Sequence, residues 1–223
     1  MKKKVRMIVL GIVVLLVVAI FIGMKIYHFI VIRNIYEAIE NFRSESNRYY
    51  LTTITSYNEM KKTEEILLKD NIAKWNEQID NIDEYCKWRD SELNKEYLIY
   101  LQSQKFKLNN LLTTQIDFLK NLPDIVLEIY QNDKLNIKLL LRIKYILPIN
   151  YNNQKCYKII TNTQTLIVSK DTYLPIYFST QFRDSETKHN NITEITYQFK
   201  VGEVTDEDIA LPDLTGYTEI MEE

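Results

Sequence analysis

The sequence predicts an α+β protein in which a membrane-spanning helix precedes one domain of antiparallel strands and helices. Three observations support this prediction: an uninterrupted apolar run near the N-terminus, an amphipathic helical pattern directly after it, and many short stretches of alternating residues in the remainder. The chain has 223 residues and a net charge of −2, which is ordinary for a folded domain.

Composition excludes several classes of site. There are 4 glycines, and Gly11 and Gly23 lie in the apolar run, so the rest of the chain has no glycine-rich phosphate loop. Positive and negative residues are mixed along the chain, whereas nucleic-acid binders carry a basic face; no nucleic-acid partner is expected.

The apolar run is predicted to be a membrane anchor. Residues 7–24 contain no charged side chain, and about 20 helical residues cross a hydrocarbon core of about 30 Å. A cleaved signal peptide is the alternative, but its apolar region is shorter and ends in a small-x-small site, whereas this run ends in "AIFIGMK". The pattern therefore favours an uncleaved single-pass anchor.

Basic residues predict the orientation of this anchor in the cell membrane. Lys2, Lys3, Lys4 and Arg6 precede the run, and only Lys25 and Arg33 follow it closely. By the positive-inside rule, residues 1–6 are expected in the cytoplasm and the C-terminal domain outside it.

Residues 25–45 are predicted to form an amphipathic helix that joins the anchor to the domain. Ile32, Ile35, Ile39 and Phe42 follow one another at steps of three, four and three, which places them on one helix face. We expect this face to pack on the domain.

Residues 46–215 are predicted to form the extracytoplasmic domain, beginning with a meander of antiparallel strands. Stretches rich in β-branched and aromatic residues are separated by polar turns; they cover 48–57, 64–69, 84–88 and 96–108. Two helices are expected next, over 111–132. The alternation from Leu135 to Ile143 favours a strand, although the neighbouring residues are good helix formers.

The last third gives the clearest strand pattern. Strands are predicted at 155–160, 165–169, 174–182 and 192–201, and Pro175 lies near the start of the third, where a missing N–H is tolerated. The acidic tail, residues 216–223, is expected to be frayed.

This last third resembles the LolA-like superfamily, which comprises extracytoplasmic lipoprotein carriers, RseB-type regulators and mycobacterial lipid-binding lipoproteins. The resemblance rests on "CYKIITN", "TLIVSKDTYLP" and "ITEITYQFKVGEVTDEDIALPD" within residues 154–214. It implies a curved antiparallel sheet, an open half-barrel, packed around helices and enclosing an apolar cavity. The chain departs from the family in its anchor, which makes it similar to a membrane-anchored Gram-positive relative, and in Tyr173, where many relatives have glycine.

No catalytic or metal-binding pattern is found in the sequence. His28 lies beside the anchor and His189 in a polar turn, so neither accompanies a nucleophile and an acid. We expect no enzyme activity, no metal and no cofactor. Cys86 and Cys156 are interpreted as buried apolar side chains, and a disulfide between them stays open.

The resemblance implies a membrane-anchored domain that binds an apolar ligand, a lipid or a lipidated protein. The residues expected to line its cavity are Leu51, Trp88, Tyr97, Ile99, Tyr197 and Phe199. The alternative is a regulatory or assembly module that contacts another envelope protein and whose interior is filled by side chains.

Overall fold

The structure, a computed structural model, describes residues 2–56, 59–109, 122, 125, 137–183 and 190–220. Two helices are described, α1 (Lys2–Ser44) and α3 (Ile137–Arg142). The strands are β1 (Asn47–Thr55), β2 (Lys61–Lys69), β3 (Ile72–Ile79), β4 (Ile82–Asp90), β5 (Lys95–Tyr100), β6 (Lys105–Asn109), β7 (Tyr145–Tyr151), β8 (Gln154–Ile160), β9 (Gln164–Ser169), β10 (Pro175–Arg183), β11 (Asn190–Val201) and β12 (Thr218–Glu219).

All of these strands belong to one large open sheet, so the α+β class is confirmed. Its order is β12-β6-β5-β4-β3-β2-β1-β11-β10-β9-β8-β7. Every pairing is antiparallel except that of β12 with β6. The meander β1–β6 therefore continues into the hairpins β7–β11 through the pairing of β1 with β11, which joins the first described strand to one of the last.

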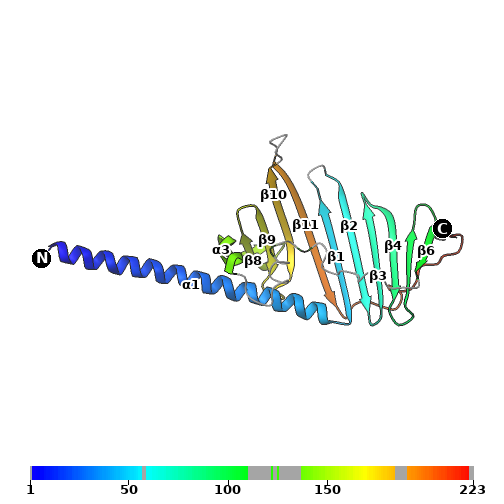
Figure 1. The fold of residues 1–223 in the computed structure, drawn as a ribbon, viewed down its shortest axis with the longest axis horizontal. Helices are drawn as coiled ribbons and strands as arrows, with labels where there is room; N and C mark the ends of the chain where they lie inside the picture. The colour runs from blue at the N-terminus through cyan, green and yellow to red at the C-terminus, as the bar shows by residue number, and fades with distance from the viewer. Residues whose placement is uncertain are drawn as a thin grey trace.

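One unbroken helix forms both the apolar run and the amphipathic segment. In Figure 1 the first half of α1 projects away from the sheet, and its second half runs along β8–β11 and ends at β1. The predicted stripe is buried: Ile32, Ile35, Ile39 and Phe42 are 0–3% exposed. Each such burial contributes roughly 1.5–3 kcal/mol, so this half of α1 is a core element of the domain.

Asparagine and aspartate set the tight hairpins. Asp80 and Asn81 have φ of 49° and 67°, and Asn152 and Asn153 have φ of 49° and 62°. Two successive left-handed residues make the turn that matches the twist of a two-residue hairpin. The first pair, with Asp70–Asn71 ahead of it, bounds β3, a strand that the sequence analysis did not predict.

The stretch from Leu135 to Ile143 is not a strand. Residues Ile137–Arg142 form α3, and the next strand, β7, begins at Tyr145. The run of leucines has high helix propensity, which outweighs the alternation here. The helices expected over 111–132 lie outside the described residues, apart from Leu122 and Ile125, which are 4% and 1% exposed in the core.

Residues 202–214, which we call the strap, cross the sheet on the side opposite α1. Asn47 fixes its start, because the Asn47 amide donates to the carbonyl of Val204 and its side-chain oxygen accepts from the N–H of Val204, both at 3.0 Å. The chain then reaches β12, which pairs with β6. Thr218 and Glu219 are therefore ordered by the sheet edge, contrary to the expected frayed tail.

Cys86 and Cys156 are free thiols. They lie on β4 and β8, which have six strands between them, an arc of roughly 34 Å at about 4.8 Å per strand. Disulfides need Cα atoms less than about 7 Å apart, so the fold excludes a bond between these two residues of one chain.

Candidate functional site

The two faces of the sheet have different coverings. We call the side on which α1 packs the helix face; it carries Tyr50, Ile66, Tyr197 and Phe199. The other side is the strap face, where Leu67 packs with Val204 and Ile209 of the strap. Trp88 holds the strap there, because its Nε1 donates to the carbonyl of Ile209 at 2.7 Å.

The six residues expected to line one cavity are divided between these faces. Tyr197 and Phe199 pair with Thr52 and Tyr50, so they lie on the helix face. Leu51 pairs with Gln198 and therefore lies on the strap face. The register places the other three on the strap face with it: Trp88, Tyr97 and Ile99. Residues of one strand that were predicted to share a face do share it, but the six residues were wrongly expected to share one face across different strands.

An aromatic cluster occupies the helix face where α1 ends. The ring of Phe42 meets Phe199 edge-on with centroids 4.9 Å apart, and Tyr50 lies 5.0 Å from Phe199. Tyr197 stacks on Phe199 at 6.3 Å. Burial and the neighbouring Tyr50 raise the pKa of Tyr197. This cluster is the most aromatic part of the described core and is the candidate apolar site.

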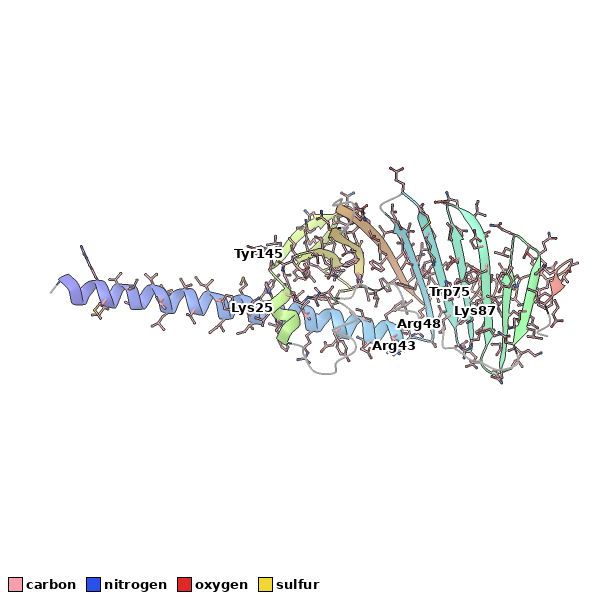
Figure 2. All side chains as sticks on the ribbon, turned by 45° about the horizontal axis from the view of Figure 1, so that its top comes forward. Lys25, Arg43, Arg48, Trp75, Lys87 and Tyr145 are labelled. Atoms are coloured by element: carbon pink, nitrogen blue, oxygen red, sulfur yellow. The ribbon has the colours of Figure 1, made fainter. Side chains whose placement is uncertain are left out.

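Beyond the end of α1, the helix face changes from apolar to charged. Figure 2 shows β2–β6 extending past Arg43, near which α1 ends. On these strands Lys62 Nζ lies 2.7 Å from Glu64 and 2.8 Å from Glu77, and the Tyr85 hydroxyl donates to Glu77 at 3.2 Å. The side chains of Glu64 and Glu77 are 2% and 10% exposed, so this is a buried ionic network.

The network is held together by charge-assisted hydrogen bonds. Burial lowers the pKa of Lys62, but the hydrogen bonds and charges of Glu64 and Glu77 outweigh it and raise that pKa overall. A second pair, Lys87 with Glu96 at 3.1 Å, continues the polar half. The sequence analysis missed these residues. Lys62, Glu64 and Ile66 are spaced two residues apart, so they lie on the same face of one strand, and the two charged residues indicate a polar stretch on a face that is otherwise apolar.

Two shallow hollows are found on the strap face within the described part of the chain. One has a volume of about 280 Å³ and the other about 230 Å³, below the roughly 300–1,000 Å³ typical of small-molecule sites. The first is lined by Leu51, Thr53, Thr196, Tyr197 and Gln198.

Within the described ranges no group of three His, Cys, Asp or Glu residues is placed to hold a metal ion. His28 is 1% exposed inside the domain, and His189 lies outside the described residues. The ionic network offers paired carboxylates and an ammonium group, and the hydroxyl that donates to Glu77 belongs to Tyr85.

Comparisons with known proteins identify no family for this chain. No family model matches the sequence, and no curated protein matches it. Among solved structures, a crystal structure described as an uncharacterized conserved protein from Thermus thermophilus is similar, with 10% identity and a TM-score of 0.45 over 84% of this chain and 97% of that chain.

Proposed function

We propose that this protein is a single-pass membrane protein whose C-terminal, LolA-like domain lies outside the cytoplasm and binds an apolar ligand, a lipid or a lipidated protein, without catalysis. In this proposal the open sheet acts as a half-barrel and the ligand lies against its helix face. The aromatic cluster of Phe42, Tyr50, Tyr197 and Phe199 carries the proposal, because these large, rigid rings form an apolar region on the helix face at the α1 terminus.

The anchor part of the proposal rests on α1. Residues 7–24 are largely exposed apolar side chains, and α1 is long and apolar enough to cross a membrane. A buried amphipathic half then continues the same helix into the domain, so the aromatic cluster at its end would lie roughly 27 Å from residue 24, at about 1.5 Å per residue.

Photo-crosslinking of the full chain tests ligand binding. The chain is placed in phosphatidylcholine nanodiscs with palmitate that carries a diazirine, irradiated, and digested for mass spectrometry. Labelled peptides are expected from β11 and from residues 35–44 at the end of α1, and excess plain palmitate should remove that label. Residues 7–24 provide an internal positive control within the bilayer; label confined to them contradicts the ligand proposal.

Topology has a separate test. Alkaline phosphatase fused after residue 45 should be active and retained in the membrane fraction, because the enzyme folds only outside the cytoplasm. An inactive fusion reverses the proposed orientation.

One observation favours the alternative, a regulatory or assembly module that contacts another envelope protein. The second half of α1 packs its apolar stripe directly on the sheet, so side chains fill the interior along this helix. A photo-reactive residue at exposed Gln198, on the strap face, would then give a discrete protein adduct in membranes. The same probe at exposed Leu93, at the β4–β5 turn, is the control.

A further inference from the structure

Large apolar side chains gather on the surface where α1 leaves the domain. We call this the proximal surface, and it is built from α1, α3 and β7. Leu141 is 69% exposed, Tyr145 55% and Leu147 44%. They are joined on α1 by Ile26 at 55%, Tyr27 at 37% and Ile30 at 50%. Tyr145 and Leu147 lie on the face of the edge strand β7 opposite the core residue Ile146, so exposed apolar side chains surround this end of the domain, and such exposure is typical of an interaction surface.

Lys25 fixes this surface to the end of the apolar run. The Lys25 ammonium group donates to the carbonyl oxygens of Leu140 at 3.0 Å and Ile143 at 3.2 Å, at the C-terminus of α3. Lys25 is the first charged residue after residues 7–24. The hydrogen bonds therefore hold α3 and the start of β7 at the level where the apolar run ends, as Figure 2 shows for Lys25 and Tyr145.

The same part of the chain is basic. Residues 137–170, which form α3, β7, β8 and β9, contain six Lys or Arg residues and no Asp or Glu, in a chain whose net charge is −2. Arg142, Lys144 and Lys155 are exposed. Apolar side chains with aromatic residues and surrounding basic groups are the combination that favours the headgroup layer of an anionic bilayer.

We propose that the proximal surface lies in the headgroup layer of the outer leaflet that holds α1, with anionic phospholipid as its partner. The inference rests on the anchoring part of the proposed function. A headgroup layer is about 5–7 Å deep on each side of the hydrocarbon core, and helical residues 25–30 rise through about that distance at roughly 1.5 Å each. Figure 1 shows α3 and β8 nearest to the projecting half of α1 and β6 toward the other end of the sheet. The sheet then stands away from the membrane, with the edge strand β7 nearest to it and the opposite edge strand β12 farthest.

An environment-sensitive fluorophore tests this orientation in the full chain. Leu141→Cys is labelled with a nitrobenzoxadiazole dye in mixed phosphatidylcholine–phosphatidylglycerol nanodiscs. The matched control is Leu93→Cys, which is 61% exposed at the far β4–β5 turn. The native Cys86 and Cys156 are 2% and 0% exposed, so labelling of the unmodified chain measures the background.

At residue 141 we expect a blue-shifted emission, loss of quenching by aqueous iodide and gain of quenching by spin-labelled lipid. Residue 93 should show none of these. Phosphatidylcholine alone, or the exchange of Lys144 and Lys155 for Glu, should restore part of the iodide quenching at residue 141. Equal iodide quenching at both residues overturns the proposal, whereas failure of the chain to enter nanodiscs refutes the anchor instead.

Discussion

The ring of Tyr173 stacks on the ring of Tyr157, with centroids 5.9 Å apart and planes 27° from parallel, although Tyr173 has a φ of 57°. A left-handed tyrosine costs roughly 1–2 kcal/mol. Two backbone hydrogen bonds of the turn offset this cost. The N–H of Tyr173 donates to the carbonyl of Ser169, and the N–H of Ser169 donates to the carbonyl of Leu174, both at 3.0 Å. A ring contact thus accompanies a conformation that glycine would adopt without strain.

Two substitutions separate the backbone from the ring at this turn. Tyr173→Ala and Tyr173→Gly both remove the stack on Tyr157, but only glycine relieves the positive φ. Tyr173→Gly should therefore be more stable than Tyr173→Ala by roughly 1 kcal/mol. Urea unfolding of the full chain in detergent, followed by circular dichroism, measures this difference. Equal stabilities would show that the turn lacks the left-handed conformation.

The strap depends on Trp88. Trp88→Phe keeps most of the apolar contact but loses the hydrogen bond to Ile209, so the free energy of unfolding should fall by about 1–2 kcal/mol. Amide hydrogen exchange should rise in residues 203–212. Protection in β8 and β9, which do not touch Trp88's hairpin, serves as the control, and a uniform change would contradict a local role.

The ionic network predicts an asymmetric response at Lys62. Lys62→Met removes the cation between Glu64 and Glu77 and should destabilise the fold by about 3 kcal/mol, near the low end for buried pairs because Lys62 is partly exposed. Lys62→Arg keeps the charge and should cost less. The matched surface control is Lys69→Met, whose partner Asp206 has an 89% exposed side chain; a loss below about 0.5 kcal/mol is expected there. Equal effects at both lysines would contradict a buried network.

Tyrosine ionisation predicts a loss of stability at alkaline pH. Burial and Glu65 raise the pKa of Tyr49 to about 12, and burial with Tyr173 and Tyr27 raises that of Tyr157 to about 12. The unfolded chain loses these protons at about pH 10, so stability is complete below pH 10 and falls between about pH 10 and 12. Urea unfolding at several pH values should show this slope, and Tyr49→Phe should reduce it. A slope unchanged in that variant would contradict the assignment.

Thiol chemistry checks the separation of the two cysteines. Burial raises the pKa of the Cys86 thiol to about 11, and Cys156 is fully buried, so both should react slowly with a disulfide reagent in the folded protein. After denaturation without reductant, two thiols per chain should react at once. If a monomeric chain showed no reactive thiol after denaturation, Cys86 and Cys156 would be joined by a disulfide, which would contradict the positions of β4 and β8 in the sheet.

Much of the local structure could be predicted from the sequence because its causes are local. The α1 stripe follows from helical spacing, and β8 to β11 follow from alternation bounded by polar turns. Strand β3 was missed although Asp and Asn pairs bound it on both sides. The segment that forms α3 was wrongly predicted as a strand, because over a few residues its leucines and isoleucines fit both the two-residue period of a strand and the 3.6-residue period of a helix.

The candidate site was harder to predict because it depends on register. A strand's alternation states that Trp88 and Cys86 share a face, but it does not state which face of the neighbouring strands they join, and a shift of one residue exchanges the two faces. Leu51, Trp88, Tyr97 and Ile99 were therefore grouped with Tyr197 and Phe199, from which the sheet separates them.

The sequence by itself determined the apolar run, the amphipathic continuation of that helix and the hairpin strands, since spacing and turn chemistry act over a few residues. Only the tertiary structure decided that Lys25 meets Leu140, that Lys62 lies between Glu64 and Glu77, and that Trp88 holds the strap. Such contacts join elements that meet only in the folded domain. Burial then fixes their pairing, because an unpaired polar group removed from water is costly.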